Sequence, residues 1–149
     1  MIYLAGSLRN PSIPQLAVDL HKATKKPVFS DWFAAGPEAD DKWKEYYKFM
    51  APESLSEAEK YQWALRMPAS RNVFDFDTRW IRQASTMVLA LPAGKSGHLE
   101  LGWFLGQGKP GFILLDDEDV RWDVMYQYAT AVCTNFDNLC DEINAYRAR

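Results

Sequence analysis

The feature that most constrains the fold is a repeated order of short apolar runs, each followed by a segment with helical spacing. Thr86–Leu91 (TMVLAL) is almost continuously apolar, which is typical of a strand that is covered on both faces. After it, Gly97–Gly106 places Leu99, Trp103 and Phe104 at helical intervals. Strands that alternate with helices in this way predict a parallel sheet with helices on both faces.

The same order extends along the whole chain. The predicted strands are Met1–Ala5, Pro27–Phe29, Thr86–Leu91, Gly111–Leu115 and Ala131–Thr134. The predicted helices are Asn10–Thr24, Lys42–Met50, Ser56–Met67, Gly97–Gly106, Trp122–Tyr128 and Asp137–Tyr146. About five parallel strands with helices on both faces make a doubly wound α/β sheet, and 149 residues are the length of a single domain covering 1–149.

Composition excludes several classes of protein. Apolar residues make up 48% of the chain and charged residues 25%, so we expect a folded globular core. The net charge is −3 and the longest basic run is Lys25-Lys26, so nucleic acid is not an expected partner. No stretch approaches the ~20 apolar residues that cross a bilayer, and the first residues do not resemble a signal peptide. We therefore expect a cytoplasmic protein with no membrane partner.

Cysteine and histidine are too sparse for a metal site. Cys133 and Cys140 form no CxxC pair, and His21 and His98 lie far apart in the sequence. We therefore expect two reduced structural thiols, no bound metal and no cofactor.

Three segments are expected at the carboxyl ends of the strands, where doubly wound sheets bind their ligands. They are Gly6–Asn10, Pro92–Glu100 and Asp116–Met125. The second contains Gly94-Lys95-Ser96, but a phosphate-binding P-loop needs a further Gly at the position of Leu89. Glu100 is expected in the first turn of the following helix, where backbone N–H groups and the helix dipole keep a carboxylate ionised. It acts as a nucleophile there, or it only complements the dipole.

Three motifs carry a resemblance to a known family. They are YLAGSLR at 3–9, FD at 76–77 ahead of WI at 80–81, and GHLELG at 97–102 followed by GQGKP at 106–110. Together they resemble the nucleoside 2-deoxyribosyltransferase-like family, which also contains deoxynucleoside 5′-monophosphate N-glycosidases. The resemblance covers Ile2 to about Tyr128 and implies a flavodoxin-like domain of five parallel strands.

The resemblance implies a double displacement at the anomeric carbon of a 2-deoxyribonucleoside. Glu100 falls on the family's nucleophile, whose attack expels the base and leaves a glycosyl ester that a second base or water cleaves with retention. Asp77 matches the acid that helps to protonate the leaving base, and Tyr3 matches the tyrosine that orients the nucleophile. Without the resemblance, Asp77 rather fits the cap of a helix beginning at Thr78, and Tyr3 an ordinary strand aromatic.

Residues just ahead of the nucleophile are candidates for substrate binding. Many family members have an acidic residue or Ser six positions before it, where this chain has Gly94, and Ser96 is the nearest hydroxyl. Gly97 completes this glycine-containing turn. His98, beside the nucleophile, either touches the sugar or caps the helix.

The base is expected to lie between aromatic side chains. Aromatic residues make up 14% of the chain, and the long acidic loop Asp31–Asp41 contains Trp32 and Phe33. The N-glycosidase branch has a His where this chain has Trp32, so we expect Trp32 and Phe33 to sandwich the base instead. The alternative is that both rings pack under the loop.

Two segments bear on the 5′ end of the substrate. Gly6-Ser7-Leu8-Arg9 resembles the segment that holds phosphate in the monophosphate-specific branch. Asp123 and Met125 line up with the segment that reaches the 5′ end from a neighbouring subunit, where transferases have Asn and monophosphate enzymes Ser. The Asp123 carboxylate repels a phosphate but accepts a hydrogen bond from a 5′-hydroxyl, which favours the free nucleoside. The alignment also implies a homo-oligomer with shared sites.

The sequence therefore predicts a nucleoside 2-deoxyribosyltransferase of nucleotide salvage, whose partners are a 2-deoxyribonucleoside and a free nucleobase. One alternative is an N-glycosidase that hydrolyses deoxynucleosides or their 5′-monophosphates, because water can replace the acceptor base. A second alternative is a non-catalytic nucleotide-binding protein. Glu100, Asp77 and Tyr3 together argue against it, because binding alone needs no nucleophile.

Overall fold

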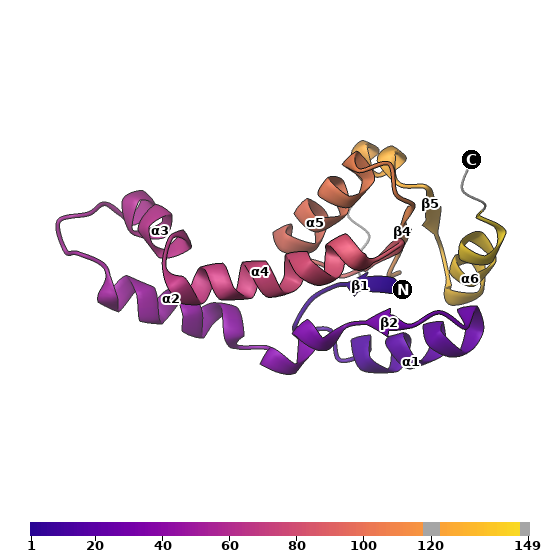
Figure 1. Cartoon of the computed structure of the whole chain (residues 1–149), viewed down its shortest axis with the longest axis horizontal. Helices are drawn as coiled ribbons and strands as arrows, with labels where there is room; N and C mark the ends of the chain where they lie inside the picture. The colour runs from indigo at the N-terminus through magenta and orange to yellow at the C-terminus, as the bar shows by residue number, and fades with distance from the viewer. Residues whose placement is uncertain (118–122, 147–149) are drawn as a thin grey trace.

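The computed structural model describes residues 1–117 and 123–146, and within them five strands form one sheet (Figure 1). The strands are β1 (Ile2–Ala5), β2 (Val28–Phe29), β3 (Thr86–Ala90), β4 (Gly111–Leu114) and β5 (Ala131–Cys133). Their order across the sheet is β2-β1-β3-β4-β5, and every neighbouring pair is parallel. This is the flavodoxin-like, doubly wound α/β arrangement, which confirms the predicted fold class.

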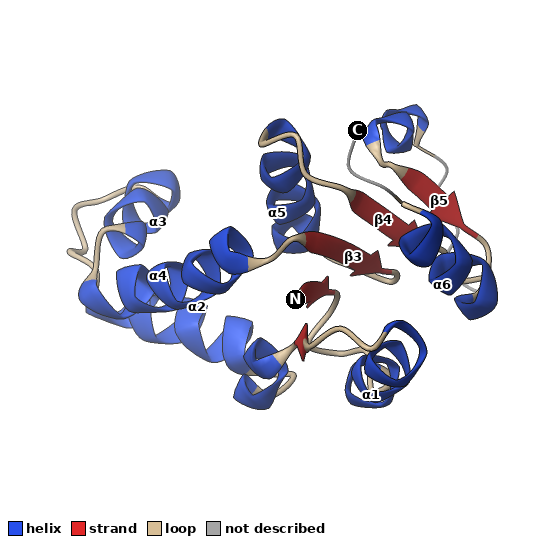
Figure 2. Cartoon of the chain, turned by 45° about the vertical axis from the view of Figure 1, so that its right-hand side comes forward, coloured by secondary structure: helices blue, strands red, loops and turns tan. Residues whose placement is uncertain are grey.

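Helices cover both faces of the sheet (Figure 2). They are α1 (Ile13–Thr24), α2 (Ala39–Met50), α3 (Glu57–Leu65), α4 (Pro68–Gln83), α5 (Lys95–Gly106) and α6 (Phe136–Ala145), with 3₁₀ turns η1 (Asp31–Ala35) and η2 (Val124–Tyr128). Helices α1 and α6 contribute to the core on one face of the sheet, and α4 and α5 to the core on the other. All five predicted strands are present, with ends that differ by one residue at most.

The alternation of side chains along β1 decides which of its residues can reach a site. Ile2 and Leu4 are buried in the core that α1 and α6 complete. Tyr3 and Ala5 point to the opposite face, because successive side chains of a strand alternate, and they join the core with α4 and α5. The ring of Tyr3 is thereby directed toward the two helices that carry Asp77 and Glu100.

Helices α2 and α3 and the first half of α4 form a helical extension that projects from one end of the sheet (Figure 1). Aromatic rings hold this extension together. Trp43 meets Tyr47 and Tyr61 edge-on, and Tyr47 meets Trp63 in the same way. Much of the high aromatic content therefore builds the extension rather than a ligand site.

Two parts of this region differ from the sequence prediction. The stretch Asp31–Asp41 is not one long loop, because η1 occupies its first half and α2 begins at Ala39. The side chain of Asp41 then lies in the first turn of α2, where the helix dipole favours an acidic residue. Helix α4 is continuous from Pro68, whereas the sequence indicated a helix start at Thr78. Proline at the first helical position loses no hydrogen bond, which explains the earlier start.

The C-terminal third follows the prediction more closely. The predicted helix Trp122–Tyr128 is a 3₁₀ turn over Val124–Tyr128, and Trp122 lies outside the described residues. Cys133 and Cys140 are buried free thiols, as predicted. Burial raises the pKa of Cys133 to about 11. The thiol therefore stays protonated and unreactive at neutral pH.

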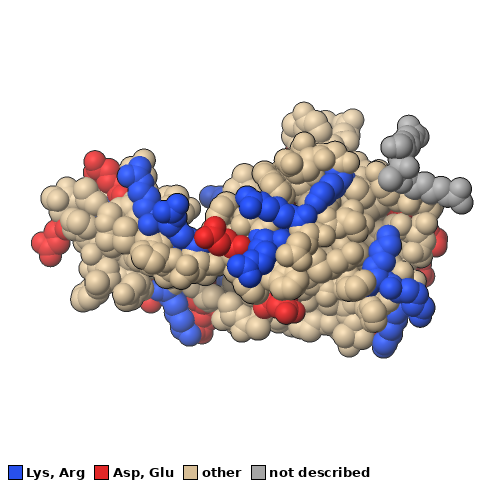
Figure 3. All heavy atoms as spheres, in the orientation of Figure 1, with Lys and Arg blue, Asp and Glu red and all other residues tan. Residues whose placement is uncertain are grey.

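The surface carries charges of both signs. On the face shown in Figure 3, basic side chains gather near the middle of the molecule, with acidic side chains beside them. In the part of the chain that the structure describes, no helix is both long and apolar enough to cross a membrane.

Candidate active site

Three side chains from separate elements meet where the strand order reverses, between β1 and β3. The hydroxyl of Tyr3 on β1 donates a hydrogen bond to Oε1 of Glu100 on α5, at 3.4 Å. The charge of Asp77 on α4 raises the pKa of both groups, so its carboxyl lies within electrostatic range of the other two. This Tyr3–Asp77–Glu100 cluster lies at the topological switch point, where doubly wound sheets bind ligands.

A stack of aromatic rings fixes the position of Tyr3. The ring of Phe29 on β2 stacks on Tyr3 with a centroid distance of 5.5 Å, and Trp80 on α4 stacks on Phe29 at 4.7 Å. Phe76 meets both Phe29 and Trp80 at a steep angle. The buried Nε1 of Trp80 has no hydrogen-bond partner among the described residues, so apolar and ring contacts hold the indole.

Burial dominates the electrostatics of Glu100. It raises the pKa of this carboxyl to about 8, and the charge of Asp77 acts in the same direction, whereas the hydrogen bond from Tyr3 lowers the pKa. The expectation that the helix dipole keeps Glu100 ionised is wrong. Helix α5 begins at Lys95, so Glu100 lies in its second turn, and the first turn contains no acidic residue.

Asp77 lies inside α4 rather than at its start. It is the tenth residue of the helix, so the alternative that it caps a helix beginning at Thr78 is wrong. The hydroxyl of Thr78 donates to the carbonyl oxygen of Phe74 instead, at 2.6 Å. Partial burial raises the pKa of Asp77 to about 6.

The two carboxyl groups titrate as a pair. With a pKa of about 6 for Asp77 and about 8 for Glu100, they hold one proton between them over the pH range between these values. Two neighbouring carboxyls that share a proton can supply a nucleophile and a proton donor in the same site. The hydrogen bond from Tyr3 favours the ionised form of Glu100.

The turn after β1 lies at the same edge of the sheet. A Cβ atom on Gly6 would stand 3.3 Å from the carbonyl oxygen of Ala90, at the end of β3. The backbone N–H of Arg9 donates to Oγ of Ser7 at 3.1 Å. The guanidinium of Arg9 pairs with Asp41 of α2, with Nη2 and Oδ2 2.7 Å apart.

Trp32 and Phe33 on η1 are partly buried against the sheet. The indole Nε1 of Trp32 donates to the carbonyl oxygen of Leu4 at 2.8 Å, and the ring packs against the cores on both faces. Phe33 packs against the core with α1 and α6 and meets Trp32 edge-on. These contacts agree with the packing alternative, and contact of the two rings with a base stays a prediction.

Two glycines shape the start of α5. Gly94 is the N-cap residue of α5, Ser96 is exposed in its first turn, and a Cβ atom on Gly97 would stand 2.8 Å from the Leu89 side chain. Gly97 therefore lets α5 approach β3 closely.

Both ring nitrogens of His98 are engaged. The Nδ1 atom lies 2.8 Å from the carbonyl oxygen of Gly94, and Nε2 lies 2.8 Å from the hydroxyl of Tyr126 on η2. Because a carbonyl oxygen only accepts, Nδ1 carries the proton of the neutral ring, and Tyr126 donates to Nε2. His98 thus hydrogen-bonds within the first turn of its own helix and docks η2 onto α5. It caps no backbone N–H group of α5, so contact of His98 with the sugar stays a prediction.

Asp123 and Met125 are exposed on the far side of this contact. The side chain of Asp123 caps η2 by accepting from the backbone N–H of Met125 at 2.8 Å. Within residues 1–117 and 123–146, Asp123 makes no hydrogen bond or ion pair with Tyr3, Asp77 or Glu100 of the same chain. The segment Asp116–Met125 lies partly outside the described residues.

Three residues of the site were missed by sequence reasoning. Trp80 follows Asp77 by one helical turn, and the motif FD ahead of WI was the available signal for it. Phe29 was assigned only to a strand, and Tyr126 only to a short helix. Their roles depend on contacts with distant residues, for which the sequence carries no local signal.

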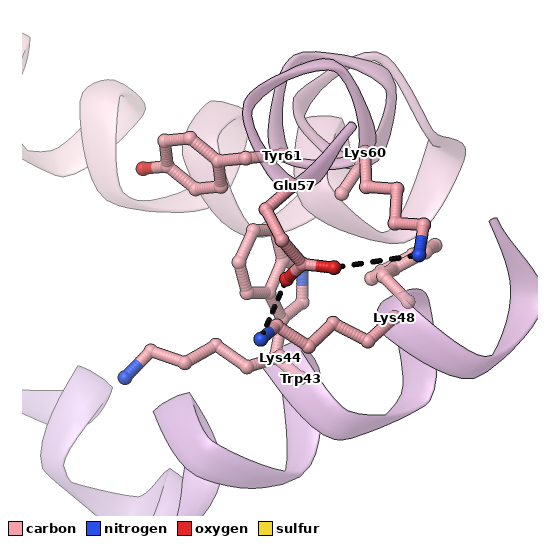
Figure 4. Close-up of a pocket in the computed structure, with 8 residues that line it drawn as sticks. Trp43, Lys44, Lys48, Glu57, Lys60 and Tyr61 are labelled. Atoms are coloured by element: carbon pink, nitrogen blue, oxygen red, sulfur yellow. Dashed lines mark hydrogen bonds and ion pairs between the residues drawn. The ribbon is translucent and has the colours of Figure 1, made fainter. Parts of the chain in front are cut away.

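A separate pocket lies in the helical extension, between α2 and α3 (Figure 4). Its walls include Trp43, Tyr61 and three lysines, and it contains none of the predicted site residues. Lys48 and Lys60 both pair with Glu57, at 2.8 and 3.3 Å. A single carboxylate is therefore shared by two ammonium groups, and the pocket lies between two helices of the extension.

The fold defines this chain as a flavodoxin-like protein, and the carboxyl pair marks a candidate site at the switch point of its sheet. Its structure is similar to that of a 2-deoxyribosyltransferase from the psychrotolerant bacterium Bacillus psychrosaccharolyticus, which is characterised as a biocatalyst for the synthesis of antiviral and antitumoral nucleosides. The TM-score is 0.54 and the identity 16%, over 98% of this chain and 91% of that chain. The resemblance predicted from the motifs is thereby confirmed at the level of the fold. No protein-family profile and no curated protein matches the sequence.

Proposed function

We propose that this protein is a nucleoside 2-deoxyribosyltransferase that exchanges the base of 2-deoxyribonucleosides. The observation that carries the proposal is the meeting of Tyr3, Asp77 and Glu100 at the switch point, with two carboxyls that share a proton. The same three residues had been singled out from the sequence motifs. The 2-deoxyribosyltransferase with a similar fold supports an activity of this class.

The reactive form of the pair has the shared proton on Asp77 and Glu100 ionised. The higher pKa of Glu100 makes this the less populated form, and the hydrogen bond from Tyr3 raises its share. In the first half-reaction, a carboxylate oxygen of Glu100 attacks the anomeric carbon. The bond between this carbon and the base nitrogen breaks, its electron pair leaves with the base, and Asp77 donates the proton that neutralises the base. The product is a deoxyribosyl ester on Glu100. Tyr3 favours this step because its hydroxyl donates to Glu100 and stabilises the attacking carboxylate.

In the second half-reaction, a nitrogen of the acceptor base attacks the same carbon. The ester bond breaks, the carboxylate of Glu100 is regenerated, and Asp77 recovers the proton that the incoming base loses. Two inversions give net retention at the anomeric carbon.

We propose that the active form is a homo-oligomer in which Asp123 and Met125 enter a neighbouring chain's site. The support is an exposed apolar surface beside the site, formed by Leu99 and Trp103 on α5 and by Val124 and Met125 on η2. In that arrangement the Asp123 carboxylate accepts a hydrogen bond from the 5′-hydroxyl of the sugar. The substrate is therefore a free nucleoside rather than a monophosphate.

Incubation with each of the four 2-deoxyribonucleosides and their 5′-monophosphates, with and without free adenine, tests the proposal. Chromatography should show deoxyadenosine forming from the other deoxynucleosides when adenine is present. Release of base at the same rate with and without adenine would instead identify an N-glycosidase. Tight binding of the nucleosides without either reaction would identify a non-catalytic binding protein.

A further inference from the structure

An ion pair joins the turn after β1 to the helical extension. The Nη2 atom of Arg9 lies 2.7 Å from Oδ2 of Asp41, in the first turn of α2, and the two residues are 32 positions apart. The other carboxylate oxygen of Asp41 lies 3.4 Å from Nζ of Lys44. One carboxylate therefore neutralises the guanidinium and also faces a second cation.

Arg9 lies on the edge of the sheet where the proposed substrate binds. Its turn begins at Gly6, which lies against Ala90 at the end of β3. Helix α5, which carries Glu100, begins beside the same turn, because a Cβ atom on Gly97 would stand 3.9 Å from Cβ of Ala5. The turn that carries Arg9 and the helix that carries Glu100 therefore lie at the same edge of the sheet.

We propose that Asp41 is a specificity-determining residue that disfavours substrates with a phosphate on the sugar. The inference rests on the proposed function, because it concerns the choice between a nucleoside and its monophosphate at that site. A guanidinium is the side chain best suited to a phosphate group. In this chain, a phosphate that binds Arg9 either displaces Asp41 from Nη2 or binds beside it, and in both cases the nearby carboxylate repels it. A neutral 5′-hydroxyl meets no such repulsion.

The chain offers a matched control for this test. Asp40 lies next to Asp41 in the first turn of α2, is exposed, and is absent from the recorded hydrogen bonds and ion pairs of the described residues. Asp41→Asn and Asp40→Asn change the net charge and the helix N-terminus equally. They differ in that Asp41→Asn releases Arg9.

Two measurements at low ionic strength use these variants. The first is binding of 2-deoxyribose 5-phosphate by titration calorimetry, with 2-deoxyribose as the uncharged reference. The second is the ratio of kcat/KM for a deoxynucleoside 5′-monophosphate to that for the nucleoside. Asp41→Asn should raise phosphate affinity and this ratio by about fivefold, the scale of one exposed ion pair, and Asp40→Asn should change neither. Adding Arg9→Gln to Asp41→Asn should remove the gain.

The inference is overturned if Asp41→Asn and Asp40→Asn behave alike while both variants keep the thermal unfolding temperature of the wild type. It is also overturned if the gain survives in the Arg9→Gln double variant, because the phosphate would then be bound by another cation such as Lys44. If Asp41→Asn unfolds, Asp41→Ala is measured in its place. A wild type with no base exchange and no hydrolysis contradicts the proposed function, whereas the calorimetric comparison still decides whether Asp41 masks Arg9.

Discussion

The hydroxyl of Tyr3 lies 3.4 Å from Oε1 of Glu100, although 97 positions separate the two residues in the chain. The contact forms because β1 pairs with β3, and α5 then returns from the end of β3 across the face to which Tyr3 points. The hydrogen bond lowers the pKa of Glu100 against the larger effect of burial. Tyr3 therefore favours the ionised form of Glu100, which is the form that the proposed mechanism needs.

Glu100→Gln should reduce turnover by about a thousandfold or more, because an amide oxygen cannot form the glycosyl ester. The variant should keep the fold, which circular dichroism checks. Mass spectrometry of the wild type after treatment with a 2-fluoro-2-deoxy nucleoside should find an adduct on the peptide that contains Glu100. Glu45→Gln, at an exposed position of α2, is the control and should keep full activity. Near-normal activity of Glu100→Gln would end the hypothesis of covalent catalysis.

The rate of base exchange should be highest between about pH 6, the pKa of Asp77, and about pH 8, the pKa of Glu100. Below this range both carboxyls are protonated and the nucleophile is lost, and above it both are ionised and the proton donor is lost. Tyr3→Phe removes the hydrogen bond that lowers the pKa of Glu100, so the basic limb, which follows the Glu100 value of about 8, should move to higher pH and kcat should fall by about tenfold. A pH profile identical to that of the wild type would contradict this role of Tyr3.

Stability should fall as the pH rises from about 4.5 to about 8. The folded-state pKa of Glu100 is raised from 4.5 to about 8, so folding favours its protonated form, and this contribution is lost as the pH rises through the folded value. Glu100→Gln should therefore flatten the pH dependence of the thermal midpoint over this range. Differential scanning calorimetry at several pH values measures the effect, and parallel curves for both proteins would refute it.

Ribonucleosides should be poor substrates. The carboxylate of Glu100 is expected to lie against C2 of the sugar when it attacks the anomeric carbon, so a 2′-hydroxyl would crowd it. Rates of base exchange from adenosine and from deoxyadenosine, measured at equal concentration, provide the comparison. Equal rates would show that the site does not distinguish the two sugars in this way.

Two inactive chains should restore activity when they are mixed. If Asp123 acts in a neighbouring site, chains with Glu100→Ala and chains with Asp123→Ala each lack one component, but a mixed oligomer contains some intact sites. Unfolding and refolding the two variants together should therefore yield more activity than either variant alone. An active wild-type monomer, found by sedimentation with activity measured on the same fraction, would contradict shared sites.

The sequence predicted the sheet well because the strand signal is local. The apolar runs around Thr86–Ala90 and Gly111–Leu114 identify buried strands without reference to the rest of the chain. The continuous helix α4 was missed because apolar Val73 and Phe74 lie on its exposed surface, so its apolar residues do not form one clear stripe. Because a helix start was expected at Thr78, Asp77 was also given the wrong alternative role of a helix cap.

Contacts across the fold were the hardest part of the site to predict. Tyr3, Asp77 and Glu100 were found through motifs, but the stack of Phe29 and Trp80 that supports Tyr3 depends on three elements meeting. The Glu100 environment was misjudged for a related reason. Its pKa depends on burial by neighbouring elements, and a helix position read from the sequence carries no information about that burial.

The pairing of β1 with β3 also has a consequence for how the chain folds. Ile2 lies opposite Thr86, so the helical extension must be spanned before these two strands can form their ladder. Closing such a long loop has an entropic cost that slows folding, whereas α2 and α3 touch each other within a short stretch of chain. We therefore expect the extension to form early and the β1–β3 pair late. Glu100 and Tyr3 then come together only in the final stage of folding, so a partly folded chain has no nucleophile in place.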